Sequence, residues 1–448
     1  MTLPSLAAAA TSATDHASVL PSAWMVLPFA GLLLCIALLP LLAAHFWERH
    51  YAKVAVGLGS VTACYYLLVL RDSHAVMHSM TEYLSFMALV GSLFVISGGI
   101  NIGVKGEATP LVNVVFLLFG ATIANIIGTT GASMLLIRPW IRMNKFRITA
   151  YHIVFFIFVV SNCGGCLTPI GDPPLFLGFL RGIPFWWVIQ QVWPAWLLCI
   201  GLLLVVFFVI DVRNFRKVPR QVAAKATAEE TWTFRGLHNL LLLALVLLGV
   251  FLPQQWKVGT EALHLTAGAL LMIAAAIISY LTTARPIHEA NDFNFHPVKE
   301  VGWLFIGIFL TMIPALQLLG SGQGITLDTP LSVYFASGSL SAFLDNAPTY
   351  LTFLAAGMGR FQLDVNQPAH VLQFLEAHPG FIVAVSLGSV FFGAGSYIGN
   401  GPNFMVKAIA EKSGVKAPGF LKYIYGFSLP LLLPILAIVG WLMLRHTH

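Results

Sequence analysis

Long apolar segments alternate with short polar ones along the whole of this 448-residue chain. A segment of ~20 apolar residues is long enough to cross a bilayer as a helix. The pattern predicts ten such spans, near residues 23–45, 53–70, 83–103, 149–170, 186–210, 236–252, 262–283, 300–320, 379–397 and 424–444. Two further apolar stretches, 111–137 and 330–358, are interrupted near their middles by polar residues. We interpret these two stretches as re-entrant hairpins.

One short pattern occurs twice, at an offset of 228 residues. Residues 170–176 (IGDPPLF) and 398–404 (IGNGPNF) are identical at four of seven positions. Both segments interrupt an apolar run with Gly and Pro, so neither continues as a regular helix. Irregular backbone at membrane depth persists only where it is buried in protein or lines a wet cavity. A matched pair of breaks in two halves of a chain therefore points to the substrate site of a secondary transporter.

The repeat extends to the two hairpins, because at an offset of 220 residues Asn125 matches Asp345 and Thr129 matches Thr349. The predicted fold class is an all-α polytopic membrane protein, an inverted repeat with two re-entrant hairpins and two broken transmembrane helices. The predicted organisation has a first half at 1–210 (hairpin 111–137, broken helix 149–181), a cytoplasmic linker at 211–235, and an inverted second half at 236–448 (hairpin 330–358, broken helix 379–410).

Composition and charge agree with a membrane location. The chain is 58% hydrophobic and 9% charged, against about 25% charged residues in soluble proteins. If the N-terminus is outside, 19 of the 24 Lys and Arg residues lie in cytoplasmic segments and 5 in outer ones, as the positive-inside rule requires. We therefore expect a multi-pass protein of the bacterial cytoplasmic (inner) membrane, whose partners are membrane lipid and small ions and not nucleic acid. The first 21 residues lack a basic n-region, so 23–45 is interpreted as a retained span and not a signal peptide.

Polar residues cluster at the two hairpin tips and the two helix breaks, which an inverted repeat brings together near the middle of the membrane. Asp172 and Asp345 are the only acidic residues that the span assignment places at membrane depth. A carboxylate there costs at least ~2.5 kcal/mol, so it is a functional candidate, although either residue could instead cap a helix end. The amides could likewise serve only as hydrogen-bonding groups between helices. The candidate ion- or substrate-binding residues are Asn125, Thr129, Asn162, Asp172, Asp345, Asn346, Thr349, Ser396, Asn400 and Asn403.

The residue types at these tips favour a cation. None of the tips contains Lys, Arg or His, and Na⁺ prefers carboxylate, amide, hydroxyl and carbonyl oxygens. Asp172 and Asp345 are the candidate Na⁺ ligands, because a buried carboxylate can exchange a proton for a cation.

The Cys163–Cys166 pair is interpreted as packing, and not as a redox or metal site. No resident cofactor is expected, with Na⁺ and H⁺ as the transported or coupling ions. The chain also lacks a phosphate-binding GxxxxGK[ST] motif.

The motifs resemble the ion transporter superfamily, which contains NhaD-type sodium/proton antiporters, citrate and dicarboxylate carriers, and arsenite pumps. The segments that carry the resemblance are residues 125–133 (NIIGTTGAS), 169–174 (PIGDPP) and 344–349 (LDNAPT). They look like the sodium/proton antiporter branch. Dicarboxylate carriers of the group typically have Ser-Asn-Thr at both hairpin tips, whereas the tips here are Ala124-Asn125-Ile126 and Asp345-Asn346-Ala347. The resemblance implies a homodimer with a scaffold domain and a moving transport domain.

The predicted function is secondary active Na⁺/H⁺ antiport by alternating access. The alternative is a Na⁺- or H⁺-coupled carrier of citrate or another di- or tricarboxylate, because relatives on one scaffold carry cations or anions. An enzyme is not expected, since the chain has neither an HExxH motif nor a Ser/His arrangement at membrane depth. A channel would not need an inverted repeat with two closed hairpins.

Overall fold

The protein is almost entirely helical. The computed structural model describes residues 20–103, 109–217, 233–255, 261–321 and 328–445. The described sheet consists of two three-residue strands, β1 (Asn101–Gly103) and β2 (Thr233–Arg235), paired antiparallel with Asn101 opposite Arg235. This small sheet was not predicted, because three residues are too few to show an alternating pattern. The predicted all-α polytopic class is confirmed.

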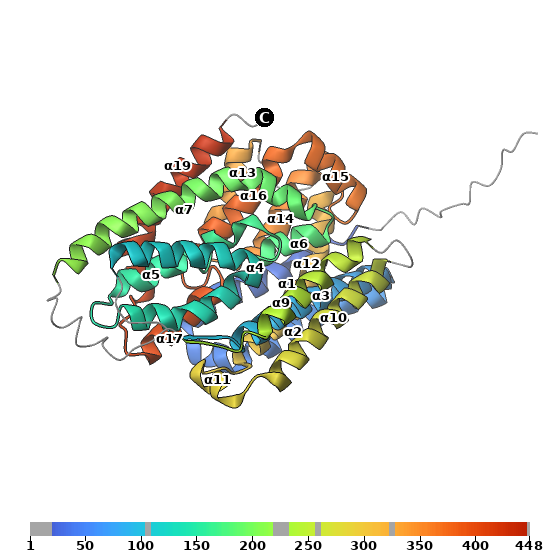
Figure 1. The fold of residues 1–448 in the computed structure, drawn as a ribbon. Coiled ribbons are helices and arrows are strands. Elements are labelled where there is room, and N and C mark those ends of the chain that lie inside the picture. The colour runs from blue at the N-terminus through green and yellow to red at the C-terminus, as the bar shows by residue number, and fades with distance from the viewer. Residues whose placement is uncertain (1–19, 104–108, 218–232, 256–260, 322–327, 446–448) are drawn as a thin grey trace, which may run out of the picture.

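The helices form two bundles that lie side by side (Figure 1). The bundle that we call the flanking bundle contains η1 (Ala23–Val26), α1 (Leu27–Leu42), α2 (Ala44–Cys64), η2 (Tyr65–Leu70), α3 (Ser73–Gly98), α9 (Asn239–Gln255), α10 (Glu261–Thr282), α11 (Arg285–Ala290) and α12 (His296–Gly320). The bundle that we call the site bundle contains α4 (Pro110–Met143), α5 (Ala150–Val159), η3 (Cys163–Leu167), α6 (Pro173–Leu180), α7 (Phe185–Phe215), α13 (Pro330–Ser341), α14 (Asn346–Gly359), α15 (Pro368–Ala377), α16 (Pro379–Phe392), η4 (Gly393–Gly395), α17 (Gly401–Lys412), α18 (Phe420–Tyr423), η5 (Ile424–Leu432) and α19 (Leu433–Leu444).

Within the described ranges, eight helices are long and apolar enough to cross a membrane. The second predicted span, 53–70, begins too late, because α1 and α2 are separated only by Ala43 and the segment 45–53 is helical. Its Glu and Arg residues are good helix formers, so polarity alone did not mark a helix end. Helix α5 is deeply enclosed, because Ile153 to Val159 are all fully buried. The first helix break therefore lies in the centre of the site bundle.

The first hairpin is present, and its two arms together form α4. Gly128, with φ 75° and ψ 155°, interrupts this 34-residue element. The two ends of α4 then meet, because the Asn113 and Asn144 amides exchange hydrogen bonds of 2.9 and 3.0 Å. The rings of Phe116 and Trp140 stack between the arms with centroids 5.6 Å apart. Although α4 is long enough to span a membrane, it folds back on itself.

The second hairpin consists of α13 and α14, joined at residues 342–345. Its base is closed by an ion pair of 3.0 Å between Asp328 and Arg360. The bases of the two hairpins lie at opposite ends of α7. Asn113 donates to Asp211 near the end of α7 at 2.9 Å, whereas Arg181, just before α7 begins, contacts Asn366 beyond hairpin 2. With 31 residues, α7 is about 46 Å long, so the hairpins enter from opposite ends of the bundle.

Part of the predicted organisation lies outside the described residues, namely the N-terminal segment up to residue 19 and residues 218–232 of the linker. Within the described part of the linker, α7 continues to Phe215, beyond its predicted end at 210. The predicted broken helices 149–181 and 379–410 correspond to α5–η3–α6 and α16–η4–α17.

Candidate functional site

Both helix breaks have the same local construction. Asp172 precedes α6 and Asn400 precedes α17, and both residues are extended, with φ,ψ of −143°,142° and −157°,141°. Prolines occupy the first helical turn that follows each of them, where a missing N–H costs nothing. Neither side chain caps its own helix. Both polar groups are therefore available to partners elsewhere in the site bundle.

The carboxylate of Asp172 joins both hairpins and both breaks. Thr129 of hairpin 1 donates its hydroxyl to Oδ1 at 2.6 Å. Asn346, at the start of α14 in hairpin 2, donates its amide to Oδ2 at 2.5 Å. Asn400 of the second break donates to Oδ1 at 3.2 Å. Asp172 is fully buried, so the four tips meet around a carboxylate that is removed from solvent.

A chain of amides extends from Asp172 into the second half. Asn400 also donates to Asn162 Oδ1 at 3.1 Å, and Asn162 donates to Asn403 Oδ1 at 2.6 Å. The amide of Asn403 donates in turn to the carbonyls of Gly393 and Ser396 at 2.8 Å each. These bonds hold the non-helical backbone of both breaks in a fixed position, as buried polar networks do when they are satisfied.

Asn125 fastens the tip of hairpin 1 to the first break. Its amide donates to Gly164 O at 2.7 Å and its oxygen accepts from Leu167 N at 2.8 Å. Thr129 N donates to Gly171 O at 2.8 Å, and a Cβ on Gly171 would collide with Gly165 O. Asn125 thus bonds to backbone atoms and not to Asp172. This is the purely structural role between helices that the sequence analysis kept open for the amides.

Asp345 and Thr349 lie in hairpin 2, and Ser396 of the second break contacts it. Asp345 Oδ1 accepts from Ala347 N at 3.0 Å, which caps α14. The hydroxyl of Thr349 donates to Asp345 O at 2.9 Å, and that of Ser396 donates to Ala342 O at 2.5 Å. Asp345 therefore caps a helix end, which the sequence analysis named as the alternative to a role in ion binding. Its acid group nevertheless lies one residue from Asn346, which contacts Asp172.

Two features bear on whether the site could hold a ligand, namely an unpartnered polar atom and a small cavity next to the cluster. Within the described residues, the Asn346 side-chain oxygen is buried without a hydrogen-bond partner. A cavity of about 20 Å³ lies where Thr129 and Gly171 face Leu89 and Leu93 of α3. That volume holds roughly one water-sized species. Among the described residues there is no cluster of three or more His, Cys, Asp or Glu side chains suited to a transition metal, and Cys163 and Cys166 are buried free thiols.

Asp172 and Asp345 are not the only acidic residues that the structure buries, fully or partly, within its described part. Glu82 of α3 is 3% exposed and pairs with Arg181 at 2.8 Å. Asp211 of α7 is fully buried and pairs with Arg147, with Tyr151 at 2.6 Å and with His152 at 3.2 Å. Both acids fall at the edges of predicted spans, so hydropathy placed them in loops. In the sequence, only the basic residues that follow the first hairpin and the first break could have indicated that these two acids have buried partners.

Comparison with known proteins places the chain in a family. No curated protein gives a significant match to it. A family model described as putative citrate transport matches residues 18–444, which is nearly the whole chain and includes all four tips. The chain therefore belongs to this putative citrate transport family, and it is a multi-pass membrane protein of the citrate transporter-like secondary transporters.

Proposed function

We propose that the protein exchanges Na⁺ for protons across the membrane, and that the carboxylate of Asp172 holds the two ions in turn. The observation that carries this proposal is the set of three neutral donors, Thr129, Asn346 and Asn400, around one fully buried acid. No Lys, Arg or His belongs to the four tips. A buried carboxylate without a basic partner favours a cation or a proton.

The neighbours of Asp172 suit both of its protonation states. The ionised carboxylate accepts all three hydrogen bonds. When it is protonated, one oxygen becomes a donor and needs an acceptor. A half-turn of the Asn346 amide would present its oxygen, which lacks a partner among the described residues. The turned amide can therefore accept the hydrogen bond of a protonated Asp172.

The same groups supply oxygen ligands for Na⁺. They are the carboxylate of Asp172, the hydroxyl of Thr129, the amide oxygen of Asn346 and the backbone carbonyls freed at the breaks, which are the ligand types that hard cations prefer. The cavity of about 20 Å³ beside Thr129 and Gly171 has the volume for one small ion. Asp345, one residue before Asn346, would add a second negative charge that favours cation binding.

A second candidate is coupled transport of citrate or another carboxylate, which the family description favours. The amides of Asn346 and Asn400 and the N-termini of α6, α14 and α17 could bind carboxylate oxygens. Two considerations weigh against this candidate. Asp172 would repel an anion unless a proton or cation were bound first, and the cavity of about 20 Å³ beside the site is smaller than a tricarboxylate.

Proton flux in proteoliposomes distinguishes the two candidates. The protein is reconstituted with a pH-sensitive dye inside the vesicles, and Na⁺, Li⁺, K⁺ or citrate is added outside in turn. Proton movement driven by Na⁺ in the absence of citrate supports the exchange. Movement that requires citrate would transfer the assignment to the carboxylate carrier. Protein-free vesicles and the Asp172→Asn variant are the controls.

Three further features form part of the proposal. The protein would lie in the bacterial inner membrane with its N-terminus outside, which the asymmetry of 19 against 5 basic residues supports. Hairpin 1 would then enter from the cytoplasm and hairpin 2 from the outside. A homodimer is proposed from the resemblance, with lipid around it.

A further inference from the structure

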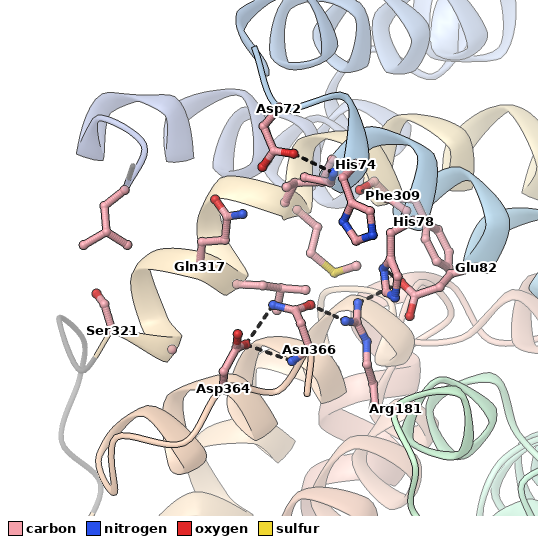
Figure 2. Close-up of a pocket in the computed structure, with 17 residues that line it drawn as sticks. Asp72, His74, His78, Glu82, Arg181, Phe309, Gln317, Ser321, Asp364 and Asn366 are labelled. Atoms are coloured by element: carbon pink, nitrogen blue, oxygen red, sulfur yellow. Dashed lines mark hydrogen bonds and ion pairs between the residues drawn. The ribbon is translucent and has the colours of Figure 1, made fainter. Parts of the chain in front are cut away.

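A cavity of about 370 Å³ lies between the two bundles at the end where hairpin 2 has its base (Figure 2). The flanking bundle lines it with the first turns of α3, from Asp72 to Glu82, and with the last turns of α12, from Phe309 to Ser321. The site bundle contributes Arg181, after α6, and the turn that holds Asp364 and Asn366. The cavity therefore borders both bundles, and this interface would shift if one bundle moved against the other.

The ion pair of Glu82 and Arg181 crosses this interface at 2.8 Å. Arg181 lies between Glu82 and Asn366 and contacts both (Figure 2). Asn366 is itself held by Asp364, whose Oδ1 accepts from both the backbone N and the side-chain amide of Asn366 at 2.9 Å. The guanidinium is thus fixed on the site bundle, and its bond to Glu82 links the two bundles.

Along α3 and along the segment that follows α6, the pair is the part of the large cavity's lining that comes nearest in sequence to the residues of the small cavity. Along α3, Glu82 lines the large cavity, whereas Leu89 and Leu93 line the small cavity beside Thr129 and Gly171. Glu82 and Leu89 are seven residues apart, which is about 10 Å along a helix. The other wall has the same order, because Phe176 of α6 lines the small cavity and Arg181, just after α6, lines the large one.

From this order we infer that the large cavity is the entry path to Asp172 from the hairpin-2 end, and that Glu82 and Arg181 form its gate. The inference rests on the proposed transport function and adds a route to it. The path suits a cation, because the cavity lining holds the three carboxylates of Asp72, Glu82 and Asp364. The other titratable or charged groups of the lining are one guanidinium, that of Arg181, and two histidines, His74 and His78, which are counted as neutral at pH 7. Such a lining raises the local concentration of positive ions.

An ion pair at this position is suited to open and close. Buried pairs are poor sources of stability compared with apolar packing, and their best-attested uses are in fixing register and in switching. Here both charges border a cavity, so water can solvate them when the bond breaks. The same pair embedded in apolar side chains would have no such compensation. The gate therefore closes the path at a modest cost and can be reopened.

The test measures how fast a reporter cysteine beside the site reacts with a charged thiol reagent. The reporter is Val90→Cys, which lines the small cavity, in a chain whose exposed Cys64 and half-buried Cys35 are changed to Ser. Purified protein in detergent is used, so the orientation in a membrane does not affect the result. We expect Glu82→Gln and Arg181→Gln to react several-fold faster than the parent chain.

Matched variants distinguish the opening of a gate from a general loss of packing in the protein. The reciprocal exchange, Glu82→Arg with Arg181→Glu, should restore slow labelling, and so should Arg181→Lys, which keeps the charge. Asp328→Asn removes an acid from the ion pair at the base of hairpin 2, which lies within one bundle, and should label at the parent rate. Unchanged labelling in both Gln variants would overturn the gate.

A second measurement applies if the Gln variants do not fold. A short bifunctional thiol reagent joining Glu82→Cys to Arg181→Cys should stop ion flux, and a cleavable form should restore flux on reduction. Flux that continues after cross-linking would contradict the inference. The labelling experiment needs no transport, so the gate can be confirmed even if Na⁺-driven flux is absent. Na⁺-driven flux with unchanged labelling would retain the proposed function and reject the gate.

Discussion

Asn400 donates a hydrogen bond of 3.2 Å to Asp172, and these two residues occupy the same position in the two halves of the chain, 228 residues apart. Cys163 and Phe391, at the same offset, also contact each other, with Sγ 3.9 Å from the carbonyl oxygen. The two broken helices therefore face each other across a pseudo-symmetry axis. One half supplies an acid at this axis and the other an amide, so the paired helix breaks place a single carboxylate at the centre of the site.

Asp172→Asn should abolish Na⁺-driven proton flux without unfolding the protein. The substitution removes the titrating charge. The new amide would face that of Asn346, but rotation of the Asn346 amide would present its oxygen as an acceptor. Flux is measured in proteoliposomes, and folding by size exclusion and thermal unfolding. Wild-type flux in a folded Asp172→Asn protein would show that Asp172 has only a structural role.

Substitutions of Asp345 separate its capping role from its charge. Asn is as good an N-cap as Asp, so Asp345→Asn should keep the stability of α14 while slowing flux less severely than Asp172→Asn. Asp345→Ala should lose the bond to Ala347 N and about 1 kcal/mol of stability. Thermal unfolding and flux are measured on both variants. Equal flux in Asp345→Asn and wild type would leave capping as the only role of Asp345.

Gly171→Ala should disrupt the first helix break. An added Cβ would collide with Gly165 O and lie 3.0 Å from Asn125 Oδ1. Overpacking of this kind typically costs about 1–3 kcal/mol. The control is Gly201→Ala in α7, where nothing lies within 4 Å of the added Cβ, and the helical preference for Ala should stabilise by about 0.5–1 kcal/mol. Thermal unfolding of both variants checks the difference, and equal shifts would contradict the close contact.

Arg147→Met should destabilise the protein by about 3–5 kcal/mol, because it leaves the fully buried Asp211 without its cationic partner. The pair joins the end of hairpin 1 to α7, so its loss should also release the bond from Asn113 to Asp211. Loss of less than about 1 kcal/mol would show that Tyr151 and His152 suffice for Asp211. The measurement is the shift in thermal unfolding.

A control for that experiment is Lys412→Ala, which removes an exposed ion pair with Asp292. The hydrogen bond from Lys412 holds the pKa of Asp292 below its ordinary value. The ion pair therefore contributes stability at pH values above the ordinary pKa of aspartate, and this contribution is lost as the pH falls through the lowered pKa of Asp292. Because both groups are exposed, we expect a change of about 0–1 kcal/mol.

Membrane orientation has its own test. Cysteines introduced one at a time at Lys145, Arg216 and Lys416 should react with an impermeant thiol reagent only after the cells are opened, because these residues lie in segments assigned to the cytoplasm. A cysteine at Arg360, near the base of hairpin 2, should react in intact cells. Labelling of the first three from outside would reverse the assignment.

Much of the architecture is visible in the sequence because its signals are local. Apolar length marks the spans, and Gly and Pro mark the breaks at Gly171 and Pro402 regardless of what surrounds them. The internal repeat also predicts that the four tips converge, which the hydrogen bonds of Thr129, Asn346 and Asn400 to Asp172 confirm. The sequence therefore determined the fold class, the two hairpins and the set of polar residues near the site.

Only the tertiary structure decided which of these residues meet. Asp172 is at the centre of the cluster, whereas Asp345 caps its own helix, although in sequence the two acids look alike. The ion pairs of Glu82 with Arg181 and of Asp211 with Arg147 join residues 99 and 64 positions apart. Hydropathy averages over about 20 neighbours along the chain, so it cannot detect a charge whose partner arrives from another helix. Burial and pairing depend on how helices pack, and that packing exists only in the folded chain.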